Sequence, residues 1–260
     1  MIPRKIHYFW IGGNPKPESV LKCIESWKKY CPNYEIIEWN ESNYDFTKNL
    51  YMRQAYERKK WGFAPDYGRL DVIYLYGGLY FDTDVELIRS PEELLKNRAF
   101  FGFDRATDTS QNTVACGLGF GAEQQHPILK NMMDVYSNVS FVKEDGSLNL
   151  LPSPYYTTRC LQEYGLKNEN RDQLLQDVMI YASDVLCPKS YGATELHLTE
   201  RTVSIHHFDA TWLDEDLKRK HDRTIRINSL LGDKLGFRVD KAINDIEYLQ
   251  STLIKRLRNR

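Results

Sequence analysis

The sequence predicts an α/β fold, in which a mixed sheet is flanked by helices. Two observations support this prediction: β-prone and helical segments alternate along the chain, and short apolar runs end at glycine or acidic residues. A third is that the sequence shows no internal repeat and no low-complexity linker, which favours one large domain. With 260 residues, 42% hydrophobic and 27% charged, the composition is that of an ordinary globular protein.

The N-terminal region predicts a strand, a helix and a second strand. Residues 6–11 are β-prone and run into the glycine turn at Gly12 and Gly13. A short strand is expected at 34–39. Between these strands, apolar residues recur at helical spacing, at Val20, Leu21, Ile24 and Trp27.

The remaining elements follow from the same patterns. Helices are expected at 47–60 and 65–76, the second ended by Gly77 and Gly78, and a short buried strand at 79–81. The rest of the chain predicts strands at 99–103, 114–120 and 203–208, helices at 127–136 and 173–182, and flexible loops at 104–113 and 137–154.

Composition excludes several classes of protein. Lys plus Arg number 35 against 36 Asp plus Glu, a net charge of −1, so nothing marks the chain as a nucleic-acid binder. Five scattered cysteines without a CxxC pair argue against a disulfide framework and a structural zinc site, and favour reduced thiols. The first residues lack the apolar run of a signal peptide, and no stretch is long enough to span a bilayer. We therefore expect a cytoplasmic protein.

Asp82 and Asp84 carry the clearest chemical signal. They follow the apolar strand expected at 79–81, and in α/β sheets ligands bind at the carboxyl ends of strands. If the chain stays extended, the two carboxylates point to the same side. Mn²⁺ or Mg²⁺ would offset their repulsion and would bind the phosphates of a substrate, so that a leaving diphosphate is neutralised.

Residues 63–85 as a whole resemble the DxD sugar-nucleotide region of glycosyltransferase family 32. That family of DxD-motif sugar transferases includes bacterial capsule and polysaccharide transferases and yeast mannosyltransferases, and is similar to the catalytic domains of clostridial glucosylating toxins. Residues 6–13 and 26–35 also match the family pattern.

The resemblance implies a glycosyltransferase type A fold with a Rossmann-like mixed sheet. It also implies a retaining, metal-dependent hexosyltransferase. The donor would be a nucleotide sugar, with a UDP-hexose favoured, and the acceptor a saccharide or lipid-linked saccharide. Capsular, exo- or lipopolysaccharide synthesis is the expected pathway.

The resemblance also implies roles for individual residues. Trp10 would stack on the nucleobase, although a core position is the alternative. Asp66 and Arg69, three residues apart on one helical face, would contact the donor or form an ion pair with each other. The full expected set is catalytic Asp66, Arg69, Asp82 and Asp84; nucleotide-sugar-binding Trp10, Gly12, Asp66, Arg69, Tyr80 and Asp82; and metal-binding Asp82, Asp84 and His206.

Two segments of the C-terminal half extend the resemblance. Residues 204–212 resemble the His-containing end of the catalytic core in related transferases. Only one of His206 and His207 can enter the pocket, because successive strand residues face opposite ways, and His206 matches the family's first His. Residues 153–157 resemble a Gly-Pro acceptor-side motif, but Ser153 replaces its glycine.

Two other functions compete with transfer. One is a sugar-binding module that has kept the fold without turnover, against which the intact acidic residues argue. The other is a haloacid-dehalogenase-type phosphatase, but Glu86 stands where that motif has Thr or Val. The glycines of 117–121 lack the GxGxxG spacing of a dinucleotide site, and close packing explains them better.

The C-terminal residues 241–260 predict an amphipathic basic helix that follows a catalytic domain of residues 1–240. Its apolar stripe is Ile243, Ile246, Leu249, Leu253 and Leu257, and its basic end is Lys255, Arg256, Arg258 and Arg260. The stripe can pack on its own domain, or the helix can touch an anionic inner membrane leaflet as a peripheral contact.

Overall fold

The computed structural model describes residues 1–105, 112–209 and 215–258, with side chains except at 215–217 and 251–258. Seven strands of this part form one mixed sheet in the order β2-β1-β3-β6-β5-β8-β7. Strands β6 and β7 run against the others. The strands are β1 Lys5–Phe9, β2 Glu35–Trp39, β3 Gly78–Tyr80, β5 Ala99–Gly102, β6 Phe120–Ala122, β7 Gln173–Leu175 and β8 Val178–Tyr181.

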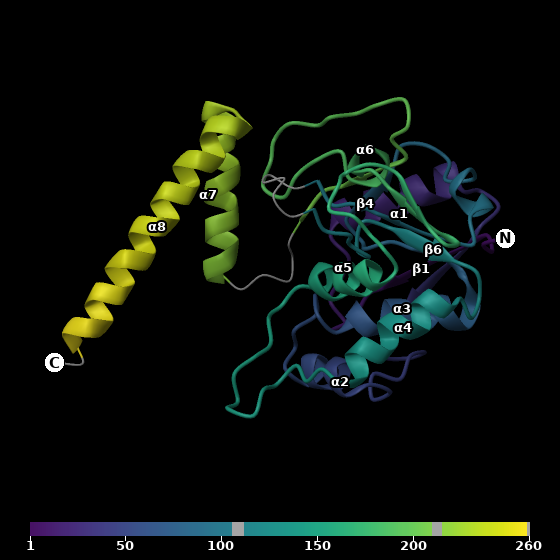
Figure 1. The fold of residues 1–260 in the computed structure, drawn as a ribbon, viewed down its shortest axis with the longest axis horizontal. Coiled ribbons are helices and arrows are strands. Elements are labelled where there is room, and N and C mark those ends of the chain that lie inside the picture. The colour runs from purple at the N-terminus through teal and green to yellow at the C-terminus, as the bar shows by residue number, and fades with distance from the viewer. Residues whose placement is uncertain (106–111, 210–214, 259–260) are drawn as a thin grey trace.

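Helices cover both faces of this sheet (Figure 1). One face carries α2 (Leu50–Glu57), α3 (Pro65–Tyr76), α4 (Pro127–Ser137) and α5 (Ser153–Glu163). The other face carries α1 (Glu18–Tyr30), the 3₁₀ turn η1 (Leu94–Lys96), α6 (Ser183–Leu186) and a two-stranded sheet of β4 (Val85–Leu87) and β9 (Ser204–His206). The α/β architecture predicted from the sequence is confirmed.

Neighbouring residues of the central strands fill opposite cores. Leu79 and Phe100 face the α1 side, whereas Tyr80 and Phe101 face the α3 side, and all four are buried. This alternation follows from the two-residue period of a strand. It explains why these short runs are apolar at every position: both faces of the sheet are covered.

The predicted helix 65–76 has the expected limits because both ends carry local signals. Pro65 occupies the first helical turn, and Gly77, with φ 62°, ends the helix. The other predicted helices and strands of the first half are also present, with α2 shorter than expected. Leu21, expected on the apolar face of α1, is instead 48% exposed, because that helix buries Val20, Ile24 and Trp27.

Two predictions of secondary structure were wrong. The helix expected at 173–182 is the hairpin of β7 and β8, which turns at Gln176 with φ 55°. Its residues follow a two-residue burial pattern, which the helical interpretation missed. The strand expected at 114–120 is irregular up to Phe120, because its glycines fold the chain across the end of β3.

The two segments expected as loops differ in outcome. Residues 106–111 of the first lie outside the described residues. The second, 137–154, is irregular between the end of α4 and the start of α5, apart from a bridge between Val142 and Leu148. Helix α5 itself was not predicted.

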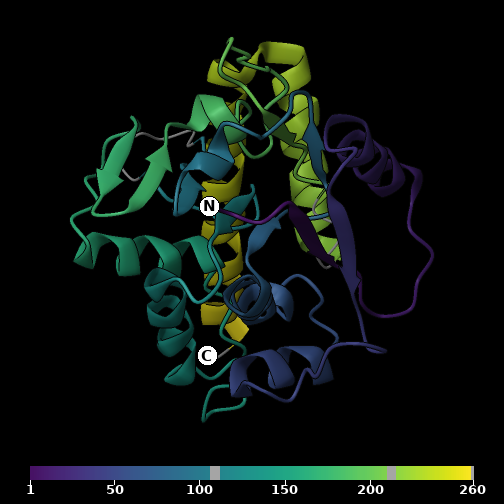
Figure 2. The same cartoon turned by 90° about the vertical axis from the view of Figure 1, so that its right-hand side faces the viewer.

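A helical hairpin forms the C-terminal extension, away from the sheet (Figure 1). Its two helices lie behind the rest of the chain in Figure 2. It consists of α7 (Glu215–Leu231), which was not predicted, and α8 (Asp233–Arg258), which begins before the expected residue 241. The turn between them is tied to the body: the Thr194 and Glu195 N–H groups donate to Asp233, and Asn228 Nδ2 donates to Gly192 O at 2.9 Å.

The apolar stripe of α8 is partly open to solvent where its side chains are described, and its first residue, Ile243, is half-buried. Ile246 is 54% exposed and Leu249 is 66% exposed, while the α7-facing side of the helix pairs Asp240 and Glu247 with Arg223. The further stripe residues Leu253 and Leu257, and the basic residues Lys255, Arg256, Arg258 and Arg260, lie outside the described side chains. Within the described ranges no helix has the length and apolarity to cross a membrane.

Candidate active site

The carboxyl ends of β1, β3 and β5 meet at one edge of the sheet. Trp10, Asp82 and Asp104 follow these strands directly or within two residues. Asp82 and Asp84 do not continue the strand as expected, because the chain turns there and the Val85 N–H donates to Asp82 O at 3.1 Å. The two carboxylates still converge, but the turn rather than the strand period brings them together.

His206 joins this pair because β9 pairs with β4. The register places His206 opposite Val85, and the His207 N–H donates to Asp84 O at 2.9 Å. The Nε2 atom of His206 lies 3.1 Å from Asp84 Oδ1. The His207 ring instead pairs with Glu86 at 2.9 Å, so it is His206 that lies in the cluster.

Asp82, Asp84 and His206, the expected metal ligands, each offer one ligand atom within 4.8 Å of the others. Burial lowers the pKa of His206, but the Asp84 carboxylate outweighs burial and raises it well above its ordinary value. Burial likewise raises the pKa of Asp84, but His206 and the Asp209 N–H outweigh burial and lower it.

This donor set fits a hard divalent cation. Two carboxylates and one imidazole suit Mn²⁺ or Mg²⁺, with open positions left for water and substrate phosphates. Because a metal ligand must be an unprotonated nitrogen, a cation here would take the place of the proton on His206 Nε2. The raised pKa of His206 reflects the attraction of the Asp84 carboxylate for positive charge at this position.

Asp66 and Arg69 form a buried ion pair that reaches the cluster. Arg69 Nη2 contacts Asp66, and Arg69 Nη1 lies 3.6 Å from Asp82 Oδ1. Burial lowers the pKa of Arg69, but the Asp82 charge outweighs burial and raises it. Among the described residues, Arg69 Nε has no hydrogen-bond partner. The ion pair, one of the two expected alternatives, is present and also faces the Asp82 carboxylate, while the expected contacts with the donor stay a prediction.

Tyr80 lies beneath the cluster and is 1% exposed. Its hydroxyl donates to Asp82 Oδ1 at 3.0 Å, and the Arg69 guanidinium stands over its ring at 5.6 Å from the centroid. Tyr80 was expected to contact the nucleotide sugar. In the structure Tyr80 contacts Asp82 and Arg69, and its contact with the donor stays a prediction.

Gly117 is a site residue whose role the sequence did not reveal. The Asp82 N–H donates to Gly117 O at 3.2 Å, and a Cβ at position 117 would collide with Asp82 Oδ2. A glycine is needed because the backbone passes directly over the carboxylate. Asp104 was also missed, although its position after β5, at the same sheet edge as Asp82, was a usable signal.

Ser153 stands at the start of α5, beside the ion pair. Its Oγ lies 3.5 Å from Arg69 Nη2, at the limit of a hydrogen bond. The helix is fixed by Thr158 Oγ1, which accepts from the Val114 N–H at 2.9 Å. The segment expected on the acceptor side therefore lies next to the expected donor-sugar residues.

Trp10 and Gly12 lie where β1 leaves the sheet. Trp10 is half-buried, and its Nε1–H donates to Asn14 O at 2.7 Å. The Gly12 N–H donates to Glu41 at 2.7 Å, and Trp61 fills the space where a Cβ of Gly12 would lie. Trp10 thus packs against the edge of the core on the α1 side, and Lys16 Nζ lies 5.7 Å from the centroid of its ring.

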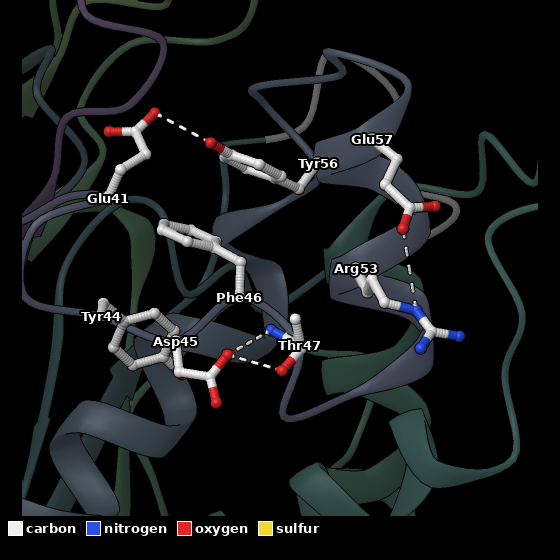
Figure 3. Close-up of a pocket in the computed structure, with 8 residues that line it drawn as sticks. All are labelled: Glu41, Tyr44, Asp45, Phe46, Thr47, Arg53, Tyr56 and Glu57. Carbon is white, nitrogen blue, oxygen red and sulfur yellow. Dashed lines mark hydrogen bonds and ion pairs between the residues drawn. The ribbon is translucent and has the colours of Figure 1, made fainter.

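Glu41 also lines a separate hollow of about 310 Å³ under the 41–47 loop and α2 (Figure 3). Its polar groups pair with one another: Asp45 accepts from Thr47, and Arg53 contacts Glu57. The lining residues are Glu41, Tyr44, Asp45, Phe46, Thr47, Arg53, Tyr56 and Glu57, which include none of the carboxylate cluster.

Residues 17–101, about a third of the chain, match a family described as "Glycosyltransferase sugar-binding region containing DXD motif". The matched segment includes Asp66, Arg69, Tyr80 and both aspartates of the motif, whereas His206 lies beyond it. No curated protein matches the chain.

The solved structures that are similar to the chain include three glycosyltransferases. The PaToxG glycosyltransferase is 21% identical with a TM-score of 0.47, over 62% of this chain and 69% of that one. A glycosyltransferase involved in glycosylation of the major capsid of PBCV-1 is 11% identical with a TM-score of 0.45, over 84% and 98%. The galactosyltransferase LgtC, solved with donor and acceptor sugar analogs, is 12% identical with a TM-score of 0.42, over 84% and 94%. Because these TM-scores are below 0.5, the fold rests on the strand order described above.

Proposed function

We propose that this chain, a glycosyltransferase by the DXD sugar-binding region in its residues 17–101, moves a hexose from a nucleotide sugar to a saccharide acceptor. A UDP-sugar is the favoured donor, and the reaction retains the anomeric configuration. The convergence of Asp82, Asp84 and His206 beside the buried Arg69 carries the proposal. Two carboxylates next to a fixed guanidinium suit a metal-bound diphosphate.

Each residue of the cluster has a separate part in this proposal. Asp84 and His206 would hold the cation directly, and Asp82 would hold it while also facing the donor ribose or sugar. A bound divalent cation would neutralise the negative charge that develops on the leaving diphosphate. Arg69 adds a second fixed positive charge, and Asp66 holds its guanidinium in place.

Retention needs an attack on the face from which the diphosphate leaves. We propose a same-face departure and attack, in which the leaving diphosphate accepts the proton of the acceptor hydroxyl. This route requires no protein nucleophile. Ser153 lies beside Arg69 and at the start of the segment that resembles an acceptor-side motif, so this side of the cluster is where the acceptor would enter.

A panel of nucleotide sugars, assayed with Mn²⁺ for release of nucleoside diphosphate, tests the proposal. We expect one donor to be turned over, with release that EDTA stops. Binding of a donor without any release would favour a sugar-binding module, and metal-dependent hydrolysis of phosphate monoesters would favour a phosphatase. The configuration of the product, read from its anomeric NMR coupling, tests retention.

We also propose that α8 brings the enzyme to an anionic membrane surface, which would suit a lipid-linked acceptor in the synthesis of a surface polysaccharide. The exposure of Ile246 and Leu249 supports this, since an apolar stripe that covered its own domain would be buried. Salt-sensitive sedimentation with anionic liposomes should disappear in the variant I246E/L249E.

The substitution L230E is the matched control, because Leu230 is 83% exposed on the same hairpin but belongs to α7. It should sediment with liposomes like the unmodified chain. If the unmodified chain stays in the supernatant at low salt, the proposed membrane contact is refuted, while the proposal of sugar transfer stands.

A further inference from the structure

The two ring nitrogens of His206 have different surroundings. Nε2 faces Asp84, but Nδ1 is buried and, among the described residues, has no partner in hydrogen-bonding geometry. A histidine that ligates a metal through Nε2 carries its proton on Nδ1, and that N–H needs an acceptor. The residues behind the ring therefore decide how well His206 serves as a ligand.

Cys187 lies behind this ring because α6 and β9 are neighbours. The Ser204 hydroxyl donates to Leu186 O at 3.1 Å, and the Val203 N–H donates to Val185 O at 2.8 Å. These bonds bring Cys187, which is 0% exposed, to the ring of His206, and the two side chains interact. Burial raises the pKa of the Cys187 thiol, and its contact with the His206 ring opposes that rise.

Asp104 completes the group from the end of β5. The Cys187 thiol lies 3.4 Å from Asp104 Oδ1 and 3.2 Å from Lys189 O, so either oxygen can accept a hydrogen bond from its S–H. Burial raises the pKa of Asp104, and the charge of His206 opposes that rise. Three elements that are distant in the chain thus bring a thiol to the imidazole and a carboxyl to that thiol.

We propose that Cys187 and Asp104 are positioning residues for the cation site: the Cys187 sulfur accepts from His206 Nδ1–H, and its own S–H donates to Asp104. This proposal rests on the proposed metal-dependent function. With a cation bound, this chain of two hydrogen bonds would keep the imidazole proton on Nδ1 and leave Nε2 free to bind the cation beside Asp84. The thiol accepts one hydrogen bond and donates another, so no proton is transferred.

Such a contact affects metal affinity rather than the chemical step. Outer partners of a ligating histidine fix its orientation and raise its basicity, and their loss lowers metal affinity by about 10- to 100-fold. Alanine at position 187 can neither accept from Nδ1–H nor donate to Asp104. Serine can do both at a shorter reach, which makes it the conservative variant.

The test is direct binding of Mn²⁺ to the full chain, measured from the EPR signal of the free ion, without substrate. We expect C187A to weaken binding by about 10- to 100-fold, C187S to restore most of it, and D104N to weaken it by a smaller factor. Pulsed EPR of the bound ion adds a structural readout, because the nitrogen modulation of a ligating imidazole depends on the hydrogen bond at its remote nitrogen. That modulation should be shared by the unmodified chain and C187S and be altered in C187A.

The substitution C31A is the matched control, since Cys31 is 1% exposed at the end of α1 and lies outside the cluster. If C187A binds Mn²⁺ like C31A, with unchanged nitrogen modulation, the positioning role is wrong although the cation site stands. If the folded, unmodified chain binds no Mn²⁺, the cation site itself is wrong and the inference falls with it. Should C187A fail to fold, C187S and D104N decide the question through the same two measurements.

Discussion

The Nε2 atom of His206 lies 3.1 Å from Oδ1 of Asp84, although the two residues come from opposite halves of the chain. Strand pairing between β4 and β9 makes this contact possible. The substitution Asp84→Asn should therefore lower transfer by about 100-fold or more, because it removes a metal-ligating charge worth several kcal/mol at little steric cost.

The measurement is turnover at saturating donor and Mn²⁺, with Glu86→Gln as control. Glu86 pairs with His207 outside the cluster, so the Glu86→Gln variant should turn over the donor at close to the rate of the unmodified enzyme. Turnover of Asp84→Asn at the level of the control would remove Asp84 from the metal site.

Trp10→Ala should weaken nucleotide binding more than it slows transfer. The ring is half-buried at the end of β1, and stacking on a base contributes about 1 to 3 kcal/mol, or about 5- to 150-fold in Kd. Titration of UDP into the folded variant checks this, and Trp10→Phe should recover part of the affinity. An unchanged Kd in the alanine variant would show that the base binds elsewhere.

Gly117→Ala should impair the site without unfolding the protein. The new Cβ would collide with Asp82 Oδ2, and displacement of a catalytic group by about 1 Å costs about 100-fold in rate. Gly121→Ala is the control: its Cβ would lie 2.6 Å from Leu79 Cδ2 in the core, so it should lower stability by about 1 to 3 kcal/mol but spare metal binding. Equal metal affinity in both variants would contradict the role of Gly117.

His7 should make stability fall with acidification. It is buried, accepts from Trp39 Nε1–H at Nδ1 and donates from Nε2 to Gly77 O, and burial lowers its pKa from 6.5 to about 4. As the pH falls, the imidazole takes up a proton in the unfolded chain at a higher pH than in the folded one. The free energy of unfolding therefore keeps its full value above pH 6.5 and decreases as the pH falls toward 4, by about 3 kcal/mol at most. Urea unfolding at each pH measures this, and His7→Gln should flatten the curve in that window.

Much of the first half of the fold could be predicted because its signals are local. Pro65 and Gly77 set the ends of α3 through their own backbone preferences, and the apolar run before Asp82 marks a strand in any context. The helix predicted at residues 173–182 was wrong because a short apolar run is compatible with a helix or a hairpin. Only the pairing of β8 with β5 decides that the hairpin forms.

The sequence by itself determined the DXD motif, the acidic and basic residues that accompany it, and the alternation of strands and helices. Only the tertiary structure decided that a turn brings Asp82 and Asp84 together, that His206 rather than His207 joins them, and that Gly117, Asp104 and Cys187 border the site. The physical reason is that these contacts depend on the pairing of distant strands. Local preferences act over a few residues, whereas the position of a side chain in a site depends on the packing of the whole sheet.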